Sequence, residues 1–556
     1  MGPVQTITRN DRPAGRGGRP PALLIGGPLP DPGLTSLAGA LERAAALNPG
    51  RAICHIAQDG SESWCTYAQL LDEASHTLGG IRRAGARPGD RVILHLADEH
   101  ELLVAFWACV LGGFVPAPLS SRLDAAAVEA AWHTLGAPWI IGDDALGDRL
   151  SGSVEGPRAH WIGAMDRLEG SGPEDGICSE PADSDWSDVA VLMLTAGSTG
   201  EPKAVMLSHG NILSRSTGTA RANGLTSHCI TFNWMPLDHV SGLVMFHVRD
   251  VVAGATQIHA HKDWILADPL RWLEVIDRHR VNAIWAANSA FDLVSSRVTQ
   301  EPGRTWDLSC VAYIMNGGAP IKARTIRRFI NSLAPHGLSG AVMRPGWGMS
   351  ETSSGVVDHR LDPPRINDDD RYVPVGVPHP GVSVRVVDDA DEIVPEGTLG
   401  HLQVTGAPVM YGYFEADALN RRVFTADRWF RTGDMAFIED DALTVTGSAD
   451  DLIRMGGQTC HGHEIESAVE ELTLVEASSA VACTVGDGEL ALFCSLTPGT
   501  RAREAAHAIR RAVRERFGLE VTHVVPMALR DIPRTPTGKP KRAQLRAGFP
   551  SAQPSH

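Results

Sequence analysis

The segment Val189–Asn211 places the strongest constraint on the fold of this chain. Val189–Leu194 is an apolar run with the length of a buried β-strand, and it breaks abruptly into TAGSTGEPK, residues 195–203. Glycine lets a backbone approach a ligand closely and turn its N–H groups toward it, while hydroxyls and a lysine add donors and positive charge. The segment therefore has the chemistry of a phosphate-binding loop. The residues that we expect to contact phosphate are Thr195, Ser198, Thr199, Gly200 and Lys203.

Neither a plain turn nor the two commonest nucleotide-binding loops account for this segment. A Gly/Ser-rich turn accounts for the glycines but not for the ordered hydroxyls and the lysine. No Walker A motif is present here or at Gly538-Lys539, and no G-x-G-x-x-G dinucleotide fingerprint is present either. The segment instead resembles [ST]-[SA]-G-[ST]-T-G-x-P-K, the signature of the adenylate-forming superfamily. That superfamily contains acyl-CoA synthetases, fatty acyl-AMP ligases, luciferases and the adenylation domains of peptide synthetases.

The fold class follows from strands that alternate with helices. Before the loop we expect a helix over Ser36–Leu47, a hairpin of Arg51–Ile56 with Ser63–Thr66, a helix over Tyr67–Ala84 and a strand at Arg91–Leu96. This order predicts an α/β fold with doubly wound sheets, followed by a β-rich subdomain. The polar, Gly/Pro-rich stretch 152–186 predicts only a surface connection.

Two later segments resemble the parts of the superfamily that hold the acid. Residues 236–243, PLDHVSGL, resemble P-x-x-H-x-x-G-L and place His239 beside the carboxylate to be activated, although a lone histidine is more often a core residue. Gly317-Gly318-Ala319-Pro320 resembles the G-G-A-P loop, whose bare backbone lines the adenine and acyl pockets. Asp238 leaves an amino-acid substrate open, because amino-acid-activating domains use an aspartate in this region. The resemblance implies an acyl pocket formed by Trp234, His239, Gly317 and Met349.

Two motifs resemble the nucleotide-binding parts. Residues 347–351, WGMSE, resemble Y-G-x-[ST]-E with tryptophan in place of tyrosine. The resemblance implies that Trp347 and Gly348 contact adenine, that Ser350 contacts a phosphate and that Glu351 ligates Mg²⁺, a hard cation that prefers oxygen ligands. WFRTGD, residues 429–434, resembles [YF]-x-T-G-D, so Asp434 is expected to accept hydrogen bonds from both ribose hydroxyls.

The C-terminal part carries a hinge and a lysine in the superfamily's order. Asp450 falls at the hinge, and Ser448 stands where relatives have an arginine, which puts thioester formation in question. Residues 533–539, PRTPTGK, resemble the tail motif and make Lys539 the candidate catalytic lysine, whereas a basic terminal segment is otherwise a solvated surface. The Gly456-Gly457 loop is expected to line the thiol channel. Cys460–Glu464 lacks zinc-site spacing and predicts only a loop and helix start.

These motifs predict four segments. They are a disordered tail over 1–30, an ATP- and acid-binding domain over 31–449, a mobile α+β lid over 450–548 and a second tail over 549–556. The net charge of −16 argues against nucleic acid as a partner. The nine cysteines form no CxxC, no apolar run reaches the ~20 residues of a membrane span, and the first residues lack a signal core, so we expect a cytoplasmic protein.

The resemblance implies a ligase that uses ATP and Mg²⁺. A carboxylic acid becomes an acyl-adenylate with release of pyrophosphate, and a thiol of CoA or of carrier-protein phosphopantetheine then displaces AMP. Four alternatives stay open: an adenylation-only enzyme that hands acyl-AMP to a partner, a standalone amino-acid adenylation enzyme, a peptide-synthetase loading component that delivers to a carrier protein, and a nucleotide-binding regulator. The last is disfavoured because Glu351 and Lys539 are both present. Natural product biosynthesis is the expected context.

Overall fold

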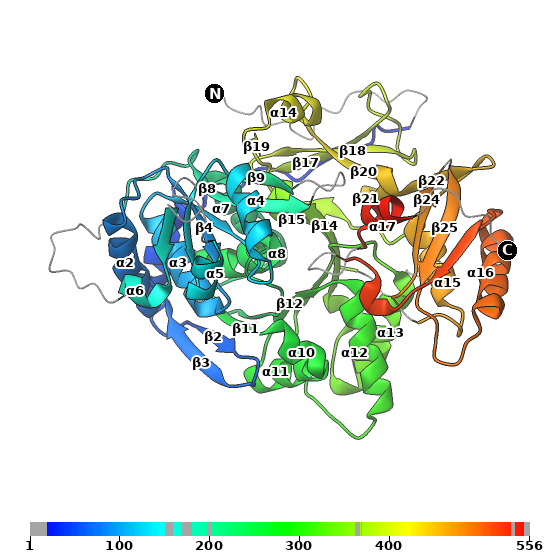
Figure 1. The fold of residues 1–556 in the computed structure, drawn as a ribbon, viewed down its shortest axis with the longest axis horizontal. Coiled ribbons are helices and arrows are strands. Elements are labelled where there is room, and N and C mark those ends of the chain that lie inside the picture. Colours follow the sequence, from blue (N-terminus) through cyan, green and yellow to red (C-terminus); the bar gives the residue numbers. More distant parts are fainter. Residues whose placement is uncertain are drawn as a thin grey trace.

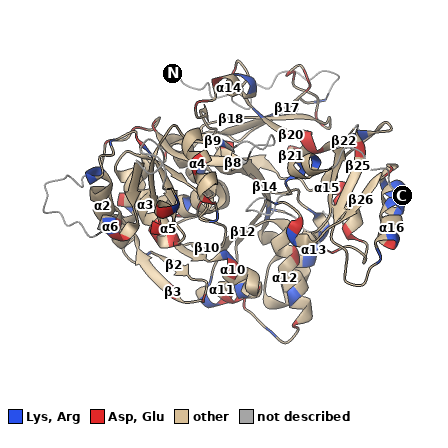
Figure 2. Ribbon diagram, in the orientation of Figure 1, with Lys and Arg blue, Asp and Glu red and all other residues tan. Residues whose placement is uncertain are grey.

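The computed structural model has an α/β fold in which helices cover both faces of several sheets (Figure 1). The residues that it describes are 19–150, 160–169, 181–196, 202–361, 367, 370–476, 478–486, 488–534 and 540–549. Figure 2 shows that acidic and basic residues are both spread over the described helices. Among the described helices, none is long and apolar enough to cross a membrane.

A nine-stranded sheet forms the centre of the described structure. Its six inner strands run parallel, which requires crossover connections such as helices α11 (Arg271–His279) and α12 (Asn288–Gln300). Antiparallel strands close both edges. In spatial order the strands are β16 (Val377–Pro378), β15 (Ser354–Asp358), β14 (Met343–Met349), β13 (Tyr313–Asn316), β12 (Ala283–Ala286), β10 (Ile230–Asn233), β11 (Thr256–Ala260), β2 (Ala52–Ile56) and β3 (Glu62–Thr66).

A second, parallel sheet corrects one expectation from the sequence. Its order is β5 (Val115–Pro118), β4 (Arg91–His95), β6 (Trp139–Gly142) and β7 (Trp161–Gly163), and it packs with helices α2 (Tyr67–Arg83), α3 (Glu99–Leu111), α4 (Ala125–Thr134) and α6 (Met165–Glu169). Stretch 152–186 was expected to be connection alone, yet it contributes β7 and α6. Met165 and Leu168 are buried, and so few apolar residues in a polar stretch give no periodic signal.

The expected phosphate loop joins two strands of a hairpin. Strands β8 (Val189–Ala196) and β9 (Pro202–Ser208) pair antiparallel, and β19 (Gly412–Tyr413) extends this small sheet. Helix α7 (His209–Asn223) follows β9, with Ser208 as its N-cap. The apolar run that predicted a buried strand is thereby confirmed as β8.

An antiparallel sheet forms the β-rich subdomain and corrects the expected N-terminal tail. Its order is β1 (Leu23–Ile25), β17 (Val382–Val387), β18 (Gly400–Gly406), β20 (Phe430–Glu439) and β21 (Ala442–Ser448). The dark-blue N-terminal segment accordingly runs beside yellow β17 in Figure 1. Residues 1–30 were expected to be disordered, but Leu23 and Leu24 are buried in this sheet, so the expectation is wrong for residues 19–30. Residues 1–18 lie outside the described part.

The C-terminal part has its own small sheets and core (orange to red in Figure 1). Its elements are hairpin β22 (Leu452–Met455) with β23 (Gln458–His461), the sheet of β24 (Val481–Val485), β25 (Glu489–Cys494) and β26 (His523–Pro526), and helices α15 (Gly462–Glu470), α16 (Ala502–Phe517) and α17 (Arg542–Gly548). Phe549, expected to begin a tail, instead packs against Phe493 and His523, with ring centroids 6.1 and 4.9 Å apart. The domain boundaries themselves stay predictions.

A hydrogen-bonded network of buried side chains lies between β11 and helix α3. Trp107 Nε1 donates to His247 Nε2 at 2.7 Å, and His247 Nδ1 lies 2.9 Å from Gln257 Oε1. Gln257 Nε2 in turn donates to the Tyr67 hydroxyl at 2.8 Å. Burial lowers the pKa of His247 to about 3, so this imidazole stays neutral in the folded protein.

The buried histidines predict a loss of stability in acid. An unfolded histidine has a pKa of about 6.5, so below that pH the unfolded chain binds protons that folded His247 does not. Each such histidine lowers the free energy of unfolding by about 1.4 kcal/mol per pH unit as the pH falls from about 6.5 toward 4. Denaturant titrations over this range should therefore show a smaller pH slope for His247→Gln, while exposed His507→Ala should match the wild type. Equal slopes in all three proteins would contradict the assignment.

Candidate active site

The β8–β9 hairpin brings Lys203 to an aromatic residue from a distant part of the sequence. Thr195 and Lys203 are cross-strand partners at the end of the hairpin where the loop joins β8 to β9, so both border the loop. The Lys203 ammonium lies 5.5 Å from the centroid of the Tyr413 ring, which is cation–π distance. The other expected phosphate contacts, Ser198, Thr199 and Gly200, lie outside the described residues.

Tyr413 also holds Glu351. This glutamate lies in the 3₁₀ turn η8 (Ser350–Thr352) between β14 and β15, and its Oε1 accepts a 2.7 Å hydrogen bond from the Tyr413 hydroxyl. Burial raises the pKa of the Glu351 carboxyl, while the Tyr413 hydrogen bond and the charge of Lys203 oppose the rise. A buried carboxylate with one oxygen fixed has the donor chemistry that a hard divalent cation requires, so Glu351 fits the expected magnesium ligand.

The turn that carries Glu351 is tightly built. Ser353 and Ser354 adopt φ values of 55° and 98°, a region that non-glycine residues seldom occupy. A Cβ at Gly348 would lie 2.1 Å from the Ser354 carbonyl oxygen, so only glycine fits there. Strained backbone conformations persist where packing and hydrogen bonds around them hold them in place, and they are common at functional sites. Ser350, expected to contact a phosphate, is buried at the start of this turn.

Trp347 and Asp434 meet across two sheets. The Trp347 indole Nε1 donates to Asp434 Oδ2 at 2.9 Å, which joins β14 of the central sheet to β20 of the β-rich subdomain. The Asp434 backbone N–H donates to Thr432 Oγ1 at 3.0 Å. The two residues expected at adenine and ribose are therefore adjacent, although 87 positions separate them in sequence.

The Gly317-Gly318-Ala319 loop follows β13 and approaches its neighbours closely. A Cβ at Gly317 would lie 2.8 Å from the Gly346 carbonyl oxygen. Gly318 has φ of +79°, and a Cβ on it would lie 3.3 Å from the Trp285 ring. Asn316 Nδ2 donates to Asn288 Oδ1 at 3.0 Å, and Asn288 Nδ2 donates to the Pro320 carbonyl. The paired asparagines thus hold both ends of the loop, at Asn316 and at Pro320.

His239 is held as a neutral imidazole. Its Nδ1 accepts the Ser241 backbone N–H at 3.2 Å and lies 2.8 Å from Ser241 Oγ. Burial lowers the pKa of His239 to about 4. A neutral ring that accepts at Nδ1 carries its proton on Nε2, so His239 can donate one hydrogen bond but does not supply positive charge at neutral pH.

The other residues expected in the acyl pocket lie in the core or at its border. Trp234 is buried, with its ring centroid 6.2 Å from that of Trp272, and its Nε1 has no hydrogen-bond partner among the described residues. Met349 is partly buried and packs against buried core residues.

Asp238 is surrounded by groups of this chain. The Ser120 side chain hydrogen-bonds to its carboxylate, and Arg122 and Lys262 lie close enough for their charges to lower its pKa. Burial is the larger effect, and the net result is a raised pKa. The protein therefore supplies Asp238 with its own hydrogen-bond donor and compensating cations.

The expected hinge adjoins strand β20, because Ser448 at the end of β21 pairs with Asp434 and the hinge turn follows directly. Asp450 is exposed in the 3₁₀ turn η10 (Ala449–Asp451), and its carbonyl accepts a hydrogen bond from Arg546 Nη2 at 3.2 Å. Gly456 and Gly457, with φ of +57° and +78°, form the exposed turn of the β22–β23 hairpin. Lys539 lies outside the described residues.

Sequence reasoning missed Tyr413, Asn288 and Trp285. Each acts through a contact with a motif residue rather than through a motif of its own. An aromatic residue next to Gly412 was the sole local signal for Tyr413.

Residues 41–414 match the family described as AMP-binding enzyme, and the chain belongs to this family of adenylate-forming enzymes. The resemblance seen in the motifs is thus confirmed at the level of the family, and the expected α/β fold is confirmed with it.

Several similar proteins are named as nonribosomal peptide synthetases or as parts of them. Nonribosomal peptide synthetase apvA of Aspergillus terreus is 29% identical over 543 residues, which cover 93% of this chain and 58% of that protein. The structure of McyG A-PCP complexed with phenylalanyl-adenylate has a TM-score of 0.87 and 31% identity, covering 94% of this chain and 84% of that one. The structure of a keto acid-selecting NRPS module has a TM-score of 0.86 and 34% identity, and the match covers 95% of this chain and 47% of that one. The chain therefore spans little more than half the length of its curated relative.

Proposed function

We propose that this protein uses ATP to convert a carboxylic acid into an acyl-adenylate and passes the acyl group to the phosphopantetheine thiol of a carrier protein, with CoA as the alternative acceptor. A carboxylate oxygen attacks the α-phosphorus and pyrophosphate leaves; the thiol sulfur then attacks the acyl carbon and AMP leaves. The observation that supports this most directly is the meeting of Lys203, Tyr413 and Glu351 from three segments, in a chain of this family.

The described residues suit the first half-reaction. Glu351, fixed by Tyr413, would hold Mg²⁺, which when bound neutralises charge on the phosphates. Lys203 and Thr195 would hold the β/γ end together with Ser198, Thr199 and Gly200. Transfer at phosphorus depends mainly on positioning and charge neutralisation, which such a cradle supplies.

The remaining residues would position the nucleotide and the acid. Asp434 would accept the ribose hydroxyls, and Trp347 would orient that carboxylate through its 2.9 Å hydrogen bond. Gly317, Gly318, Ala319 and Gly348 would line adenine, and Ser350 a phosphate. His239 would donate from Nε2 near the carboxylate, beside Trp234, Gly317 and Met349 in the acyl pocket.

We further propose an acid without an α-ammonium group. The side chain that would receive such an ammonium, Asp238, already has Ser120 as a donor and Arg122 and Lys262 as nearby cations. A substrate ammonium would have to displace or share these partners. Among the relatives, one structure holds phenylalanyl-adenylate and another is described as keto acid-selecting, so both substrate classes occur in the family.

Pyrophosphate exchange with matched acids tests this proposal. Phenylpyruvate and phenylalanine share a side chain and differ at the α-carbon, so their exchange rates report that position alone; benzoate and a fatty acid extend the panel. We expect the keto acid to exceed the amino acid, with acyl-AMP identified by mass. The opposite order would contradict the proposed acid class, and no exchange with any acid would contradict adenylation. Thioester formation with CoA or holo carrier protein then decides the acceptor.

Trp347→Phe is expected to raise KM for ATP by about 10-fold with little change in kcat. Phenylalanine keeps an aromatic ring but removes the hydrogen bond to Asp434, and a bond to a charged group contributes ~1.5–3 kcal/mol. Initial rates of exchange at varied ATP measure this. In the Asp434→Asn background the same substitution should have a smaller effect; full additivity would contradict the coupling.

Asp450→Pro is expected to spare pyrophosphate exchange and to reduce thioester formation by at least ~10-fold, because proline fixes the backbone of a hinge whose side chain is exposed. Asp450→Ala, which leaves the backbone free, should retain both reactions. Thioester formation at the wild-type rate in Asp450→Pro would count against a hinge at this position.

A further inference from the structure

A second group of chemically distinctive side chains lies on β3, α2 and α3, which carry none of the residues in the proposed adenylation chemistry. Cys65 is the penultimate residue of strand β3, Glu73 lies on α2 and His100 lies on α3. One ligand atom from each lies within 4.8 Å of the others. His100 Nε2 is 2.6 Å from Glu73 Oε2, and Cys65 Sγ makes a weak 3.4 Å hydrogen bond to the Thr66 carbonyl.

A buried histidine on the neighbouring strand adjoins this group. The β2–β3 register pairs Ile53 with Cys65 and His55 with Ser63, so His55 and Cys65 share one face of the sheet. The His55 ring packs edge-on against His100, with centroids 5.5 Å apart. His55 is 9% exposed, and both of its ring nitrogens are buried without a hydrogen-bond partner among the described residues. Burying imidazole nitrogens without a hydrogen-bond partner lowers the stability of the fold, unless a ligand or an ion binds them.

We propose that these four side chains bind a zinc ion. Cys65 Sγ, a Glu73 oxygen and a His100 nitrogen would become ligands once the ion replaces the His100–Glu73 hydrogen bond, and a small shift of the neighbouring His55 ring would supply the fourth. A set of one thiolate, one carboxylate and two imidazoles suits Zn²⁺, whereas Mg²⁺ and Ca²⁺ prefer all-oxygen sites. On binding, the Sγ–H bond breaks and its proton passes to solvent.

Access and connectivity are consistent with a resident ion. The His100 and Glu73 side chains are 34% and 40% exposed, so the ion can enter from solvent while Cys65 and His55 close the inner side. The site would link β2 and β3 of the central sheet to α2 and α3. If zinc binds the folded chain and not the unfolded chain, it would therefore raise the thermal stability of the protein.

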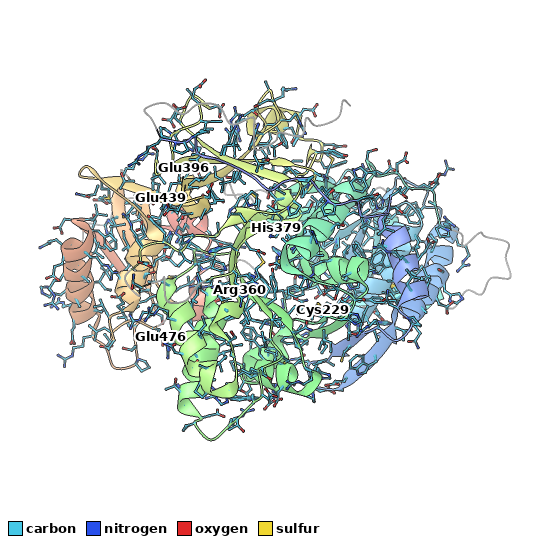
Figure 3. The ribbon with its side chains drawn as sticks, turned by 180° about the vertical axis from the view of Figure 1, so that it is seen from behind. Cys229, Arg360, His379, Glu396, Glu439 and Glu476 are labelled. Atoms are coloured by element: carbon cyan, nitrogen blue, oxygen red, sulfur yellow. The ribbon has the colours of Figure 1, made fainter. Side chains whose placement is uncertain are left out.

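The test uses the full-length, untagged protein, stripped with a chelator and titrated with Zn²⁺ against a chromophoric competitor. We expect one zinc per chain, and Cys65→Ser and His100→Ala should each weaken binding by at least ~10-fold. Matched controls are Cys229→Ser, at the half-buried cysteine labelled in Figure 3 just before β10, and His507→Ala, at an exposed histidine; both should bind as the wild type does. Zinc should raise the Tm of the wild type and controls only.

Cobalt supplies a readout that does not depend on activity. Co²⁺ in the wild type should show a thiolate charge-transfer band and tetrahedral visible bands; the charge-transfer band should vanish in Cys65→Ser, and His55→Ala should alter the visible bands. Circular dichroism checks folding, and Glu73→Gln serves as a fourth ligand variant at a partly exposed position if another fails to fold. Absent zinc binding, equal affinity in the ligand variants, or a cobalt spectrum without the thiolate band would each overturn the proposal.

Discussion

Replacing Lys539 with alanine is expected to abolish pyrophosphate release with every acid while sparing thiolysis of supplied acyl-AMP. The P-R-T-P-T-G-K segment resembles the superfamily's tail motif, and we propose that its lysine bridges the incoming carboxylate and the α-phosphate. Loss of one positioned donor to developing charge costs on the order of 10²–10³ in rate, and a full positive charge is lost here. Pyrophosphate release and thioester formation from synthetic acyl-AMP are measured separately on the same preparation.

The control for this experiment lies two residues away. Lys541→Ala removes an exposed charge from the same basic segment and should leave both half-reactions near the wild-type rate. If Lys539→Ala slowed both half-reactions equally, the lysine would serve general stability or binding rather than adenylation, and its assigned role would be refuted.

Glu351→Gln is expected to reduce acyl-adenylate formation by about 10²–10³. The amide oxygen can still accept the Tyr413 hydroxyl, so the packing of the η8 turn is retained and the carboxylate charge alone is lost. The Mg²⁺ concentration for half-maximal exchange should rise accordingly. Titrating Mg²⁺ at saturating ATP measures this shift.

Tyr413→Phe separates orientation from charge. This variant keeps the carboxylate and the ring beside Lys203 but removes the 2.7 Å hydrogen bond, so a smaller loss of about 10-fold is expected. A Glu351→Gln protein with unchanged Mg²⁺ dependence would show that the metal binds elsewhere. Equal losses in the two variants would instead point to a structural role for the pair.

Local patterns predicted much of the fold because they report forces that act within a few residues. The helix over Ser36–Leu47 begins at a residue whose side chain caps it, and the hairpin of β2 and β3 pairs two runs joined by a short turn. The buried run Val189–Leu194 became β8 for the same reason. The ordered motifs, each with its own resemblance, identified the family before any packing was known.

The features that escaped prediction depend on partners far away in sequence. Strand β1 is ordered by pairing with β17, some 360 positions on, and three residues in a Gly/Pro-rich segment give no periodic signal. Tyr413 matters because it reaches Glu351, and Asp238 is defined by Ser120, Arg122 and Lys262. No local pattern encodes which distant segments meet, so these partners required the three-dimensional structure.

The pairing of β1 with β17 has a practical consequence for making this protein. A chain trimmed at residue 31, the first residue of the expected catalytic domain, would lose β1 and bare the hydrogen-bonding edge of β17. Uncovered edges recruit strands from other molecules, so such a truncation invites aggregation during expression. Recombinant boundaries should therefore retain residues 19–30, and fusion partners are better joined upstream of them.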